Sequence, residues 1–193
     1  RHIHGGEVYY FGKRVHTLDP QKWLRNGLIY LTEDRKDEGL ILDMGIPANI
    51  SLANLWRMFK NGVINRKAEQ ALSEQTVKEL NIMCKNPTQP VKTLSGGNQQ
   101  KVVLAKWLTR NCDVLIFDEP TRGIDIGAKN EIYKLLDRLA SEGKAIIMIS
   151  SELPEIIRVS NRVLVMCEGQ ITGEVTGSDI NQEKIMQYAT MRD

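Results

Sequence analysis

Two adjacent acidic residues, Asp118 and Glu119, directly follow four apolar residues at positions 114–117. A short apolar run containing β-branched and aromatic side chains predicts a strand buried on both faces, as in a parallel sheet. Open α/β sheets bind ligands at the carboxyl ends of such strands. Neighbouring carboxylates there can hold a hydrated Mg²⁺ and position or deprotonate a water. The alternative is a strand that ends in a polar turn, and Pro120, which lacks an N–H, would end the strand in either case.

A second group that could bind an anion lies upstream, where Ser95, Gly96 and Gly97 precede a predicted helix that begins with residues 98–105. Glycines leave backbone N–H groups uncovered, the serine adds a hydroxyl, and the start of a helix carries partial positive charge. This pattern therefore suits a phosphate. The same residues would also serve as an ordinary turn and N-cap. The residues alone leave both interpretations open.

The order and spacing of these groups resemble those of the ATP-binding-cassette (ABC) ATPases. LSGGNQQK at 94–101 is similar to the signature loop of that family, VLIFDEP at 114–120 to its Walker B strand, and TRGID at 121–125 to its D-loop. The motif NQQK at 98–101, together with EPTRGIDIGAK at 119–129, further resembles the second nucleotide-binding half of two-cassette ATPases. These ATPases belong to bacterial monosaccharide importers of the ribose, galactose, xylose and allose type. Nearly the whole chain from Gly5 onward fits this pattern.

The resemblance implies a role for each motif residue, with ATP and Mg²⁺ as cofactors. Asp118 would hold Mg²⁺ through a water, Glu119 would be the catalytic glutamate, and Asp125 would belong to the D-loop. The signature loop would contact ATP through five residues: Ser95, Gly96, Gly97, Asn98 and Gln99.

Two further candidate catalytic residues depart from the general pattern of the family. Glu33, in the loop at 32–36, stands where a glutamine is usual, although the resembled second halves commonly have this EDRK wording. A carboxylate can accept from metal-bound water but cannot donate as an amide does. Ser151 stands where a histidine is usual, and a hydroxyl is no proton reservoir at neutral pH. For Glu33, a solvated charged loop is the alternative.

A phosphate loop of the form GxxxxGK[ST] does not occur in the printed sequence. Such a loop would cradle the β- and γ-phosphates with its backbone and its lysine. The nearest glycine pair, Gly5 and Gly6, lacks the lysine and predicts a β-turn. Because the chain also begins with Arg1, we expect it to start after the phosphate loop of its cassette, and to be inactive as an isolated chain.

Length and composition predict one domain, since 193 residues are enough for a single core. The 26 basic and 24 acidic residues nearly cancel, which gives no electrostatic reason to bind nucleic acid. We find no apolar run of the roughly 20 residues that a membrane span requires, and no signal peptide. We therefore expect a soluble chain. Three scattered cysteines predict thiols in a reducing cytosol: Cys84, Cys112 and Cys167.

The expected fold is α/β: a P-loop NTPase-like ABC cassette with a mainly parallel sheet, an antiparallel β-hairpin and an inserted helical subdomain. Residues 1–38 would hold the hairpin and the first core strand, residues 39–93 the helical subdomain, and residues 94–193 the signature helix, the Walker B strand and the C-terminal core.

The N-terminal residues predict a hairpin at 7–16, a helix at 19–26 and a strand at 28–31. Three aromatic residues of the hairpin could stack on adenine or pack within the hairpin: Tyr9, Tyr10 and Phe11. Three histidines lack a fourth ligand and a helical spacing, so no metal cluster is expected from them: His2, His4 and His16.

Residues 39–91 predict helices, because small and apolar residues recur at helical spacing between charged ones, as at Ala68, Leu72, Thr76 and Leu80. In the resembled family this region receives the coupling helix of the permease. Three residues could line that groove or belong to the core: Trp56, Met58 and Phe59. Farther on we expect a helix at 127–142, a buried strand at 145–150, strands at 163–167 and 170–174, and a helix at 182–190.

The resembled ATPases work as head-to-tail dimers, in which each ATP lies between the phosphate loop of one cassette and the signature loop of the other. The implied partners are an N-terminal cassette of the same polypeptide or a second ATPase copy, a membrane permease and an extracytoplasmic sugar-binding protein. They would place the chain on the cytoplasmic side of the bacterial plasma membrane. We expect Ser95, Gly96 and Gly97 to act on the partner's ATP during monosaccharide import.

Two other function classes remain open at this point. In one, the chain is a nucleotide-gated structural partner with no turnover at its own degenerate site. In the other, it belongs to a soluble ABC ATPase of repair or translation. Such proteins usually add coiled coils or basic segments, and the sequence contains neither.

Overall fold

A three-stranded parallel sheet forms the centre of the molecule. The computed structural model describes residues 5–15, 19–60, 63–110 and 112–191. The sheet has the order β3-β6-β7, built from β3 (Leu28–Leu31), β6 (Val114–Asp118) and β7 (Ala145–Ile149). Both pairings are parallel, so the carboxyl ends of all three strands lie at one edge. The predicted strand at 28–31 is confirmed at both ends.

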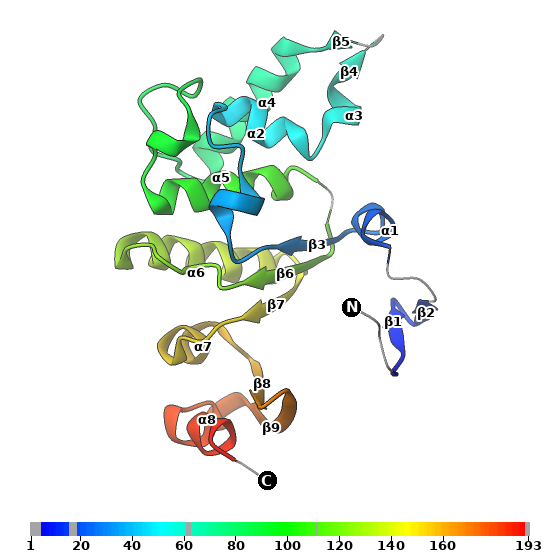
Figure 1. Ribbon diagram of the computed structural model, residues 1–193, viewed down its shortest axis with the longest axis vertical. Coiled ribbons are helices and arrows are strands. Elements are labelled where there is room, and N and C mark those ends of the chain that lie inside the picture. Colours follow the sequence, from blue (N-terminus) through cyan, green and yellow to red (C-terminus); the bar gives the residue numbers. More distant parts are fainter. Residues whose placement is uncertain (1–4, 16–18, 61–62, 111, 192–193) are drawn as a thin grey trace.

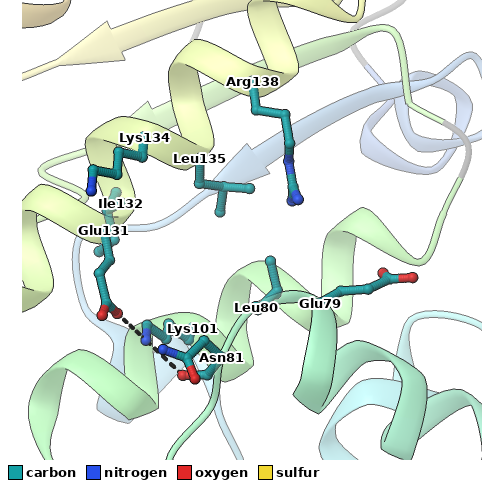
Figure 2. Close-up of a pocket in the computed structure, with 9 residues that line it drawn as sticks. All are labelled: Glu79, Leu80, Asn81, Lys101, Glu131, Ile132, Lys134, Leu135 and Arg138. Carbon is teal, nitrogen blue, oxygen red and sulfur yellow. Dashed lines mark hydrogen bonds and ion pairs between the residues drawn. The ribbon is translucent and has the colours of Figure 1, made fainter.

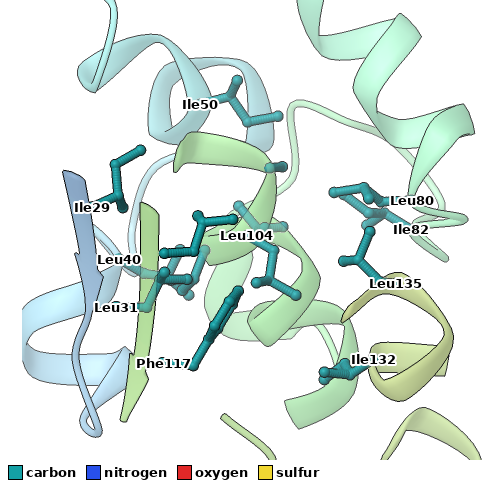
Figure 3. Packing of buried hydrophobic residues seen from close by; sticks show 14 of the residues in the cluster. Ile29, Leu31, Leu40, Ile50, Leu80, Ile82, Leu104, Phe117, Ile132 and Leu135 are labelled. Atoms are coloured by element: carbon teal, nitrogen blue, oxygen red, sulfur yellow. The ribbon is translucent and has the colours of Figure 1, made fainter. Parts of the chain in front are cut away.

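One face of this sheet carries the main core. Leu31 and Phe117 are paired in register on that face and are almost fully buried. They point toward Leu104 of the long helix α5 (Gly96–Leu108), as Figure 3 shows. Helix α6 (Ile126–Ser141) adds Ile132 and three leucines to the same cluster: Leu135, Leu136 and Leu139. Apolar burial of this extent is the main favourable term that holds such a core together.

The opposite face of the sheet is not buried in the same way. Tyr30, Ile116 and Ile147 are neighbours in register on that face, and Tyr30 and Ile147 are 47% and 51% exposed. Ile149, at the end of β7, is 48% exposed. The prediction that the strand at 114–117 is buried on both faces is therefore wrong, and so is the prediction of a buried strand at 145–150, in which three residues of β7 are exposed. The physical reason is that α5 and α6 share one core cluster with the other face.

The N-terminal hairpin consists of β1 (Val8–Tyr10) and β2 (Lys13–Val15), and it is followed by α1 (Pro20–Arg25). The predicted hairpin and helix are confirmed, and Asp19 caps α1 by accepting a hydrogen bond from the Gln21 N–H at 2.9 Å. Among the three aromatics, Tyr10 packs edge-on against Trp23 and donates its hydroxyl to the Asn26 carbonyl at 2.7 Å. The three histidines considered for a metal cluster lie outside the described residues.

The region between β3 and α5 is mainly helical, as predicted, but it contains two features that the sequence did not indicate. A π-helical turn, η1 (Arg35–Gly39), replaces part of the expected loop at 32–36, because the Asp34 carboxylate accepts from the backbone N–H groups of Lys36 and Asp37. A short hairpin also interrupts the helices. The elements here are α2 (Ile46–Leu52), α3 (Leu55–Met58), β4 (Phe59–Lys60), β5 (Val63–Ile64), α4 (Arg66–Glu79) and the 3₁₀ turn η2 (Val91–Thr93).

Helix α4 buries part of the face that we predicted together with neighbouring polar residues: Thr76 and Leu80 of that face are buried. Ala68 and Leu72 are half-buried, whereas Glu69 and Ser73 are buried. The buried Glu69 carboxylate accepts a hydrogen bond from the Ser51 hydroxyl at 2.6 Å, which compensates for its removal from water. Of the three large side chains that were ambiguous, Met58 is buried in the core, while Trp56 and Phe59 are exposed.

The C-terminal residues form a second, smaller core. It contains α7 (Leu153–Val159), β8 (Arg162–Cys167), β9 (Gln170–Thr176), the turn η3 (Gly177–Asp179) and α8 (Gln182–Ala189). The strands β8 and β9 pair antiparallel with each other, and within the described residues neither joins the central sheet. Figure 1 shows this unit beyond α7, separate from the sheet. Both strands and α8 were predicted, and α7 was not.

Two further predictions concern the cysteines and the membrane. Cys84, Cys112 and Cys167 are all free thiols, and burial raises the pKa of the Cys112 thiol. Among the described residues, no helix combines the length and the apolar character needed to span a bilayer.

Candidate functional site

The carboxylates that end β6 lie where the parallel strands leave the sheet. Asp118 is the last residue of β6, and its Oδ2 accepts a 2.6 Å hydrogen bond from the hydroxyl of Tyr30 on the neighbouring strand. This hydrogen bond, with a smaller contribution from burial, raises the pKa of Tyr30 to about 12. The phenol therefore stays protonated at neutral pH and remains a donor to Asp118. Carboxylate oxygens are the ligands that Mg²⁺ prefers, so Asp118 fits a cation bound through water.

Glu119 is held in an unusual backbone conformation next to the strand β7. Its φ is +45°, in the left-handed region that non-glycine residues seldom adopt. Its N–H donates to the Ile149 carbonyl at 2.9 Å, and its Oε1 accepts from the Ser151 N–H at 2.8 Å. Left-handed residues of this kind cost about 1–3 kcal/mol and persist where the surroundings fix them. The two bonds to the end of β7 therefore fix the direction of the Glu119 carboxylate.

The structure brings Ser151 to Glu119, but through its backbone. Ser151 donates its backbone N–H to Glu119, and its side chain is exposed. A neighbouring carboxylate, Glu155 on α7, is only 1% exposed and accepts hydrogen bonds from the hydroxyls of Thr121 at 2.9 Å and Ser150 at 2.7 Å. Glu155 thus joins the loops that follow β6 and β7. Sequence reasoning missed it, because a glutamate early in a helix usually signals only a solvated first turn.

The predicted signature loop caps α5 and is closely packed. Ser95 is the N-cap: its Oγ accepts from the Asn98 N–H at 3.4 Å and from the Asn98 Nδ2 at 2.9 Å. Asn98 in turn accepts a 2.7 Å bond from the Met83 N–H. Gln99 is buried and donates its Nε2 to the Val91 carbonyl at 3.2 Å. The N-cap that we gave as the alternative interpretation is therefore present, and it leaves the helix start free to attract an anion.

Both positions of this loop must be glycine, because their backbone lies too close to residues 123–128 for a side chain to fit. A Cβ added to Gly97 would lie 2.4 Å from the Cβ of Ala128, and one added to Gly96 would lie 3.1 Å from the Gly123 carbonyl oxygen. Asp125 is the N-cap of α6, since its Oδ1 accepts from the Ala128 N–H at 2.9 Å. The predicted signature loop and D-loop residues are therefore packed directly against each other.

Glu33 lies on the loop between β3 and η1 and forms an ion pair with Arg122, which follows β6. Both side chains are substantially exposed, so the pair contributes little to stability by itself. From the same loop, Arg35 donates Nη1 to the Arg122 carbonyl at 2.7 Å. Glu33 therefore contacts the segment that follows Asp118 and Glu119, and the structure brings these predicted site residues to one region.

Two hollows lie away from these carboxylates. One, of about 300 Å³, is lined by α4, α5 and α6 and is shown in Figure 2. There the buried Lys101 donates to the Asn81 carbonyl at 2.8 Å and pairs with Glu131. The other, of about 440 Å³, is lined by residues of η1, α2 and α5 that include Leu52, Ala53 and Trp107. Neither hollow contains a predicted ATP-contacting residue.

The described residues offer donors for part of a nucleotide. The start of α5 and Ser95 suit a phosphate, and Asp118 suits a hydrated cation. A lysine-bearing glycine loop does not occur among the residues that the structure describes. The geometry therefore supports contacts to phosphate and metal at two separate places, one at α5 and one at β6.

Residues 2–122 match the family model described as "ABC transporter". A relative in Burkholderia lata, which carries the provisional name of a ribose/galactose/methyl galactoside import ATP-binding protein, is 53% identical over 99% of this chain and 38% of its own length. A ribose import ATP-binding protein of Clostridium tetani is 47% identical over 95% of this chain and 37% of its own length. The chain thus spans well under half the length of these curated relatives.

Solved structures share the fold. A dimeric ATP-binding cassette in a post-hydrolysis state, bound to ADP and Pi, superposes with a TM-score of 0.74 at 20% identity, covering 90% of this chain and 74% of that one. The ADP conformation of an ATP-binding cassette of an ABC transporter gives a TM-score of 0.75 at 18% identity, covering 96% of this chain and 76% of that one. The predicted cassette fold is confirmed.

Proposed function

Because the chain belongs to the ABC transporter family, we propose that it is the ATP-binding segment that couples ATP binding and hydrolysis to monosaccharide import through a membrane permease. The names of the relatives in Burkholderia lata and Clostridium tetani, which refer to ribose and galactose import, support this substrate class. The observation that carries the proposal is the close packing of the start of α5 against residues 123–128, which presents Ser95 and the first N–H groups of the helix as a preformed anion site.

The segment acts chiefly on ATP held by a partner cassette. Ser95 and the backbone N–H groups of Gly96 and Gly97 donate to the γ-phosphate of that ATP and stabilise the charge that develops as the phosphoryl group departs. Donors that are fixed before the reaction need no reorganisation during it. The close contact between Gly97 and Ala128 supports such preorganisation.

The segment also contributes residues to its own nucleotide site. Asp118 holds a hydrated Mg²⁺, which when bound neutralises phosphate charge, and Tyr30 orients the carboxylate by donating to one of its oxygens. Glu119, directed by the Ser151 N–H, positions or deprotonates the attacking water. Glu33, which is paired with Arg122, would be available as an acceptor for metal-bound water.

The chain is the second cassette of a two-cassette ATPase, and the phosphate loop of that cassette precedes Arg1. The half-exposed isoleucines Ile147 and Ile149 support an additional segment next to β7, because β7 pairs only with β6 among the described strands. A parallel strand normally has both faces covered and both edges paired or protected. We propose that a strand of the preceding segment packs beside β7 and carries the phosphate loop to Asp118.

The partners are the first cassette or a second copy of the ATPase, the permease and an extracytoplasmic sugar-binding protein, at the cytoplasmic face of the bacterial plasma membrane. The permease docks on the helical region, where Trp56 and Phe59 are exposed and a hollow lies beside Leu52 and Trp107. A helix-in-groove contact places the apolar face of an amphipathic helix in a hydrophobic groove.

A second candidate function is a nucleotide-gated structural partner with no turnover at its own site. It is favoured by Ser151, which meets Glu119 through a backbone N–H and has no imidazole to exchange a proton. The two candidates share the role of Ser95 and differ only in what happens at Asp118 and Glu119.

Calorimetric titration of Mg-ATP into the 193-residue chain, paired with a phosphate-release assay, tests the proposal. We expect neither tight binding nor turnover from the chain alone, and turnover when the partner cassette and the preceding segment are present. Hydrolysis by the isolated chain that is lost on Glu119→Gln would instead assign the working site to this segment.

A further inference from the structure

Arg35 links two loops that belong to different nucleotide sites. It begins η1, immediately after the loop that carries Glu33. Its guanidinium donates Nη1 to the Arg122 carbonyl at 2.7 Å and Nη2 to the Gly123 carbonyl at 3.3 Å. Charge-assisted bonds of this kind are about twice as strong as neutral ones. The forked guanidinium is suited to hold two successive carbonyls, which a single ammonium group cannot do in the same geometry.

The same guanidinium lies against the signature loop. A Cβ at Gly96 would come 2.9 Å from Arg35 Nη2, so only a glycine leaves this side chain its place. The turn that carries Arg35 is fastened to α5 a second time, because Lys106 donates its Nζ to the Gly39 carbonyl at 3.0 Å. Figure 1 shows this short turn after β3 lying against α5. Arg35 is thus packed between residues 122–123 and the first turn of α5.

The position of Arg35 is fixed by its own turn. The carboxylate of Asp34 accepts from the N–H of Lys36 at 2.9 Å and of Asp37 at 3.1 Å, and these bonds, Asp37 first, lower the pKa of Asp34. Residue 122 is in turn held on two sides, with its side chain paired to Glu33 and its carbonyl bonded to Arg35. Residue 122 is therefore the point at which the Glu33 loop and the Arg35 turn both contact the segment that lies against Gly96.

One donor of Arg35 has no partner in this arrangement. Its Nε is buried, and within the described residues it donates to no acceptor. A buried unpaired donor costs about 1–3 kcal/mol. The guanidinium that bridges the loops therefore keeps one donor that the described residues do not use.

We propose that Arg35 is a positioning residue that couples the two nucleotide sites, because it holds residues 122–123 of its own site's loop against Gly96 of the loop offered to the partner's ATP. The inference rests on the proposed function. It adds that occupancy of the site at Asp118 is passed to the signature loop through the Arg35 guanidinium.

A double-mutant cycle on the ATPase assembled with its permease tests this coupling. ATP turnover is measured for wild type, Arg35→Ala, Asp118→Asn and the double variant. Arg35→Ala is expected to lower kcat about fivefold or more while KM for ATP stays within about twofold, since the signature donors act in the transition state. Asp118→Asn should lower kcat in the wild-type background and cause no further loss once Arg35 is absent. If the two substitutions lowered kcat by independent factors, so that the double variant showed their product, the link would be overturned.

Two further variants separate positioning from general stability. Lys36→Ala removes an exposed cation next to Arg35 on the same turn and should leave kcat within about twofold of wild type. Arg35→Lys keeps the charge but not the fork, and should restore only part of the lost kcat. Equal kcat for Arg35→Ala and Lys36→Ala, or full rescue by lysine, would contradict the assignment. A wild-type assembly that hydrolyses no ATP would overturn the proposed function as well, whereas an active one without coupling overturns only the role of Arg35.

Discussion

The start of α5 and the carboxyl ends of β6 and β7 differ in how completely this chain builds them. At α5, Gly96 and Gly97 leave no room for a side chain between themselves and residues 123–128. At the strand ends, Asp118 and Glu119 are correctly directed, but Ile147 and Ile149 beside them are about half exposed. Under the proposed function, the chain would complete the loop that it offers to a partner cassette, whereas its own nucleotide site would depend on further residues.

The largest difference should appear between substitutions of one serine in each region, Ser95 at the start of α5 and Ser151 after β7. Ser95→Arg places a long cation at the start of α5, where it fills the anion site and removes the cap, so sugar transport should fall by about a hundredfold or more. Ser151→Ala should change transport by less than about twofold, because alanine retains the N–H that Glu119 uses. Uptake of labelled monosaccharide by membrane vesicles would measure both. Equal losses would break the contrast between the two regions.

A methyl group at Gly97 should be the most damaging small change. The new Cβ would lie 2.4 Å from the Ala128 Cβ, so α5 and α6 must separate. Overpacking of this kind costs about 1–3 kcal/mol, which lowers the midpoint of thermal unfolding by roughly 2–4 °C for each kcal/mol. Calorimetry would measure the shift. Gly5→Ala, with nothing within 4 Å, is the matched control, and Gly97→Ala with Ala128→Gly should recover much of the loss.

Glu155 joins the loops that follow β6 and β7, and the substitution Glu155→Leu should test this contact. The substitution leaves the hydroxyls of Thr121 and Ser150 without their acceptor, and Thr121 is fully buried. We expect a loss of roughly 2 kcal/mol in the free energy of unfolding, measured with urea. Glu142→Leu, at an exposed helix end, is the control and should change it by less than about 0.5 kcal/mol. Indistinguishable losses would mean that the loops after β6 and β7 are not joined by this carboxylate.

The elements that local signals specify were predictable from the sequence. The strand at 28–31 lies between Gly27 and a polar loop, the helix after Asp19 carries its own cap, and the signature and Walker B motifs mark their elements directly. The hairpin of β4 and β5 escaped because each strand has two residues, too few for a periodic pattern. Exposure of one sheet face also could not be foreseen, since an apolar run does not reveal which neighbours cover it.

The contacts within the site were less predictable than its residues. Asp118, Glu119 and Gly97 were identified from their types and spacing. Their partners were not, because Tyr30 meets Asp118 only when β3 and β6 become neighbours, and strand order is a property of the whole fold. Arg35 binds backbone carbonyls, which carry no signal in the sequence. Sequence reasoning thus proposes candidate site residues more readily than the residues that hold them in place.

The smallest predicted effect concerns the tyrosine that orients Asp118. The hydrogen bond to Asp118 raises the pKa of Tyr30 to about 12 from its usual 10.0. A group whose pKa is higher in the folded state contributes stability below its unfolded pKa and loses it as the pH rises through the folded value. The contribution of Tyr30 should therefore be constant below about pH 10 and disappear between about pH 10 and pH 12.

Tyr30→Phe should accordingly lower the free energy of unfolding slightly at neutral pH, and should bring it close to that of wild type near pH 12. The effect is small because the side chain is half exposed and water screens the interaction. Urea unfolding at several alkaline pH values, with tyrosinate formation followed by ultraviolet absorbance, would measure it. If the difference in the free energy of unfolding between wild type and Tyr30→Phe did not vary with pH, Asp118 would be oriented without this hydroxyl. The end of β6 would then depend even more on residues outside it than the start of α5 does.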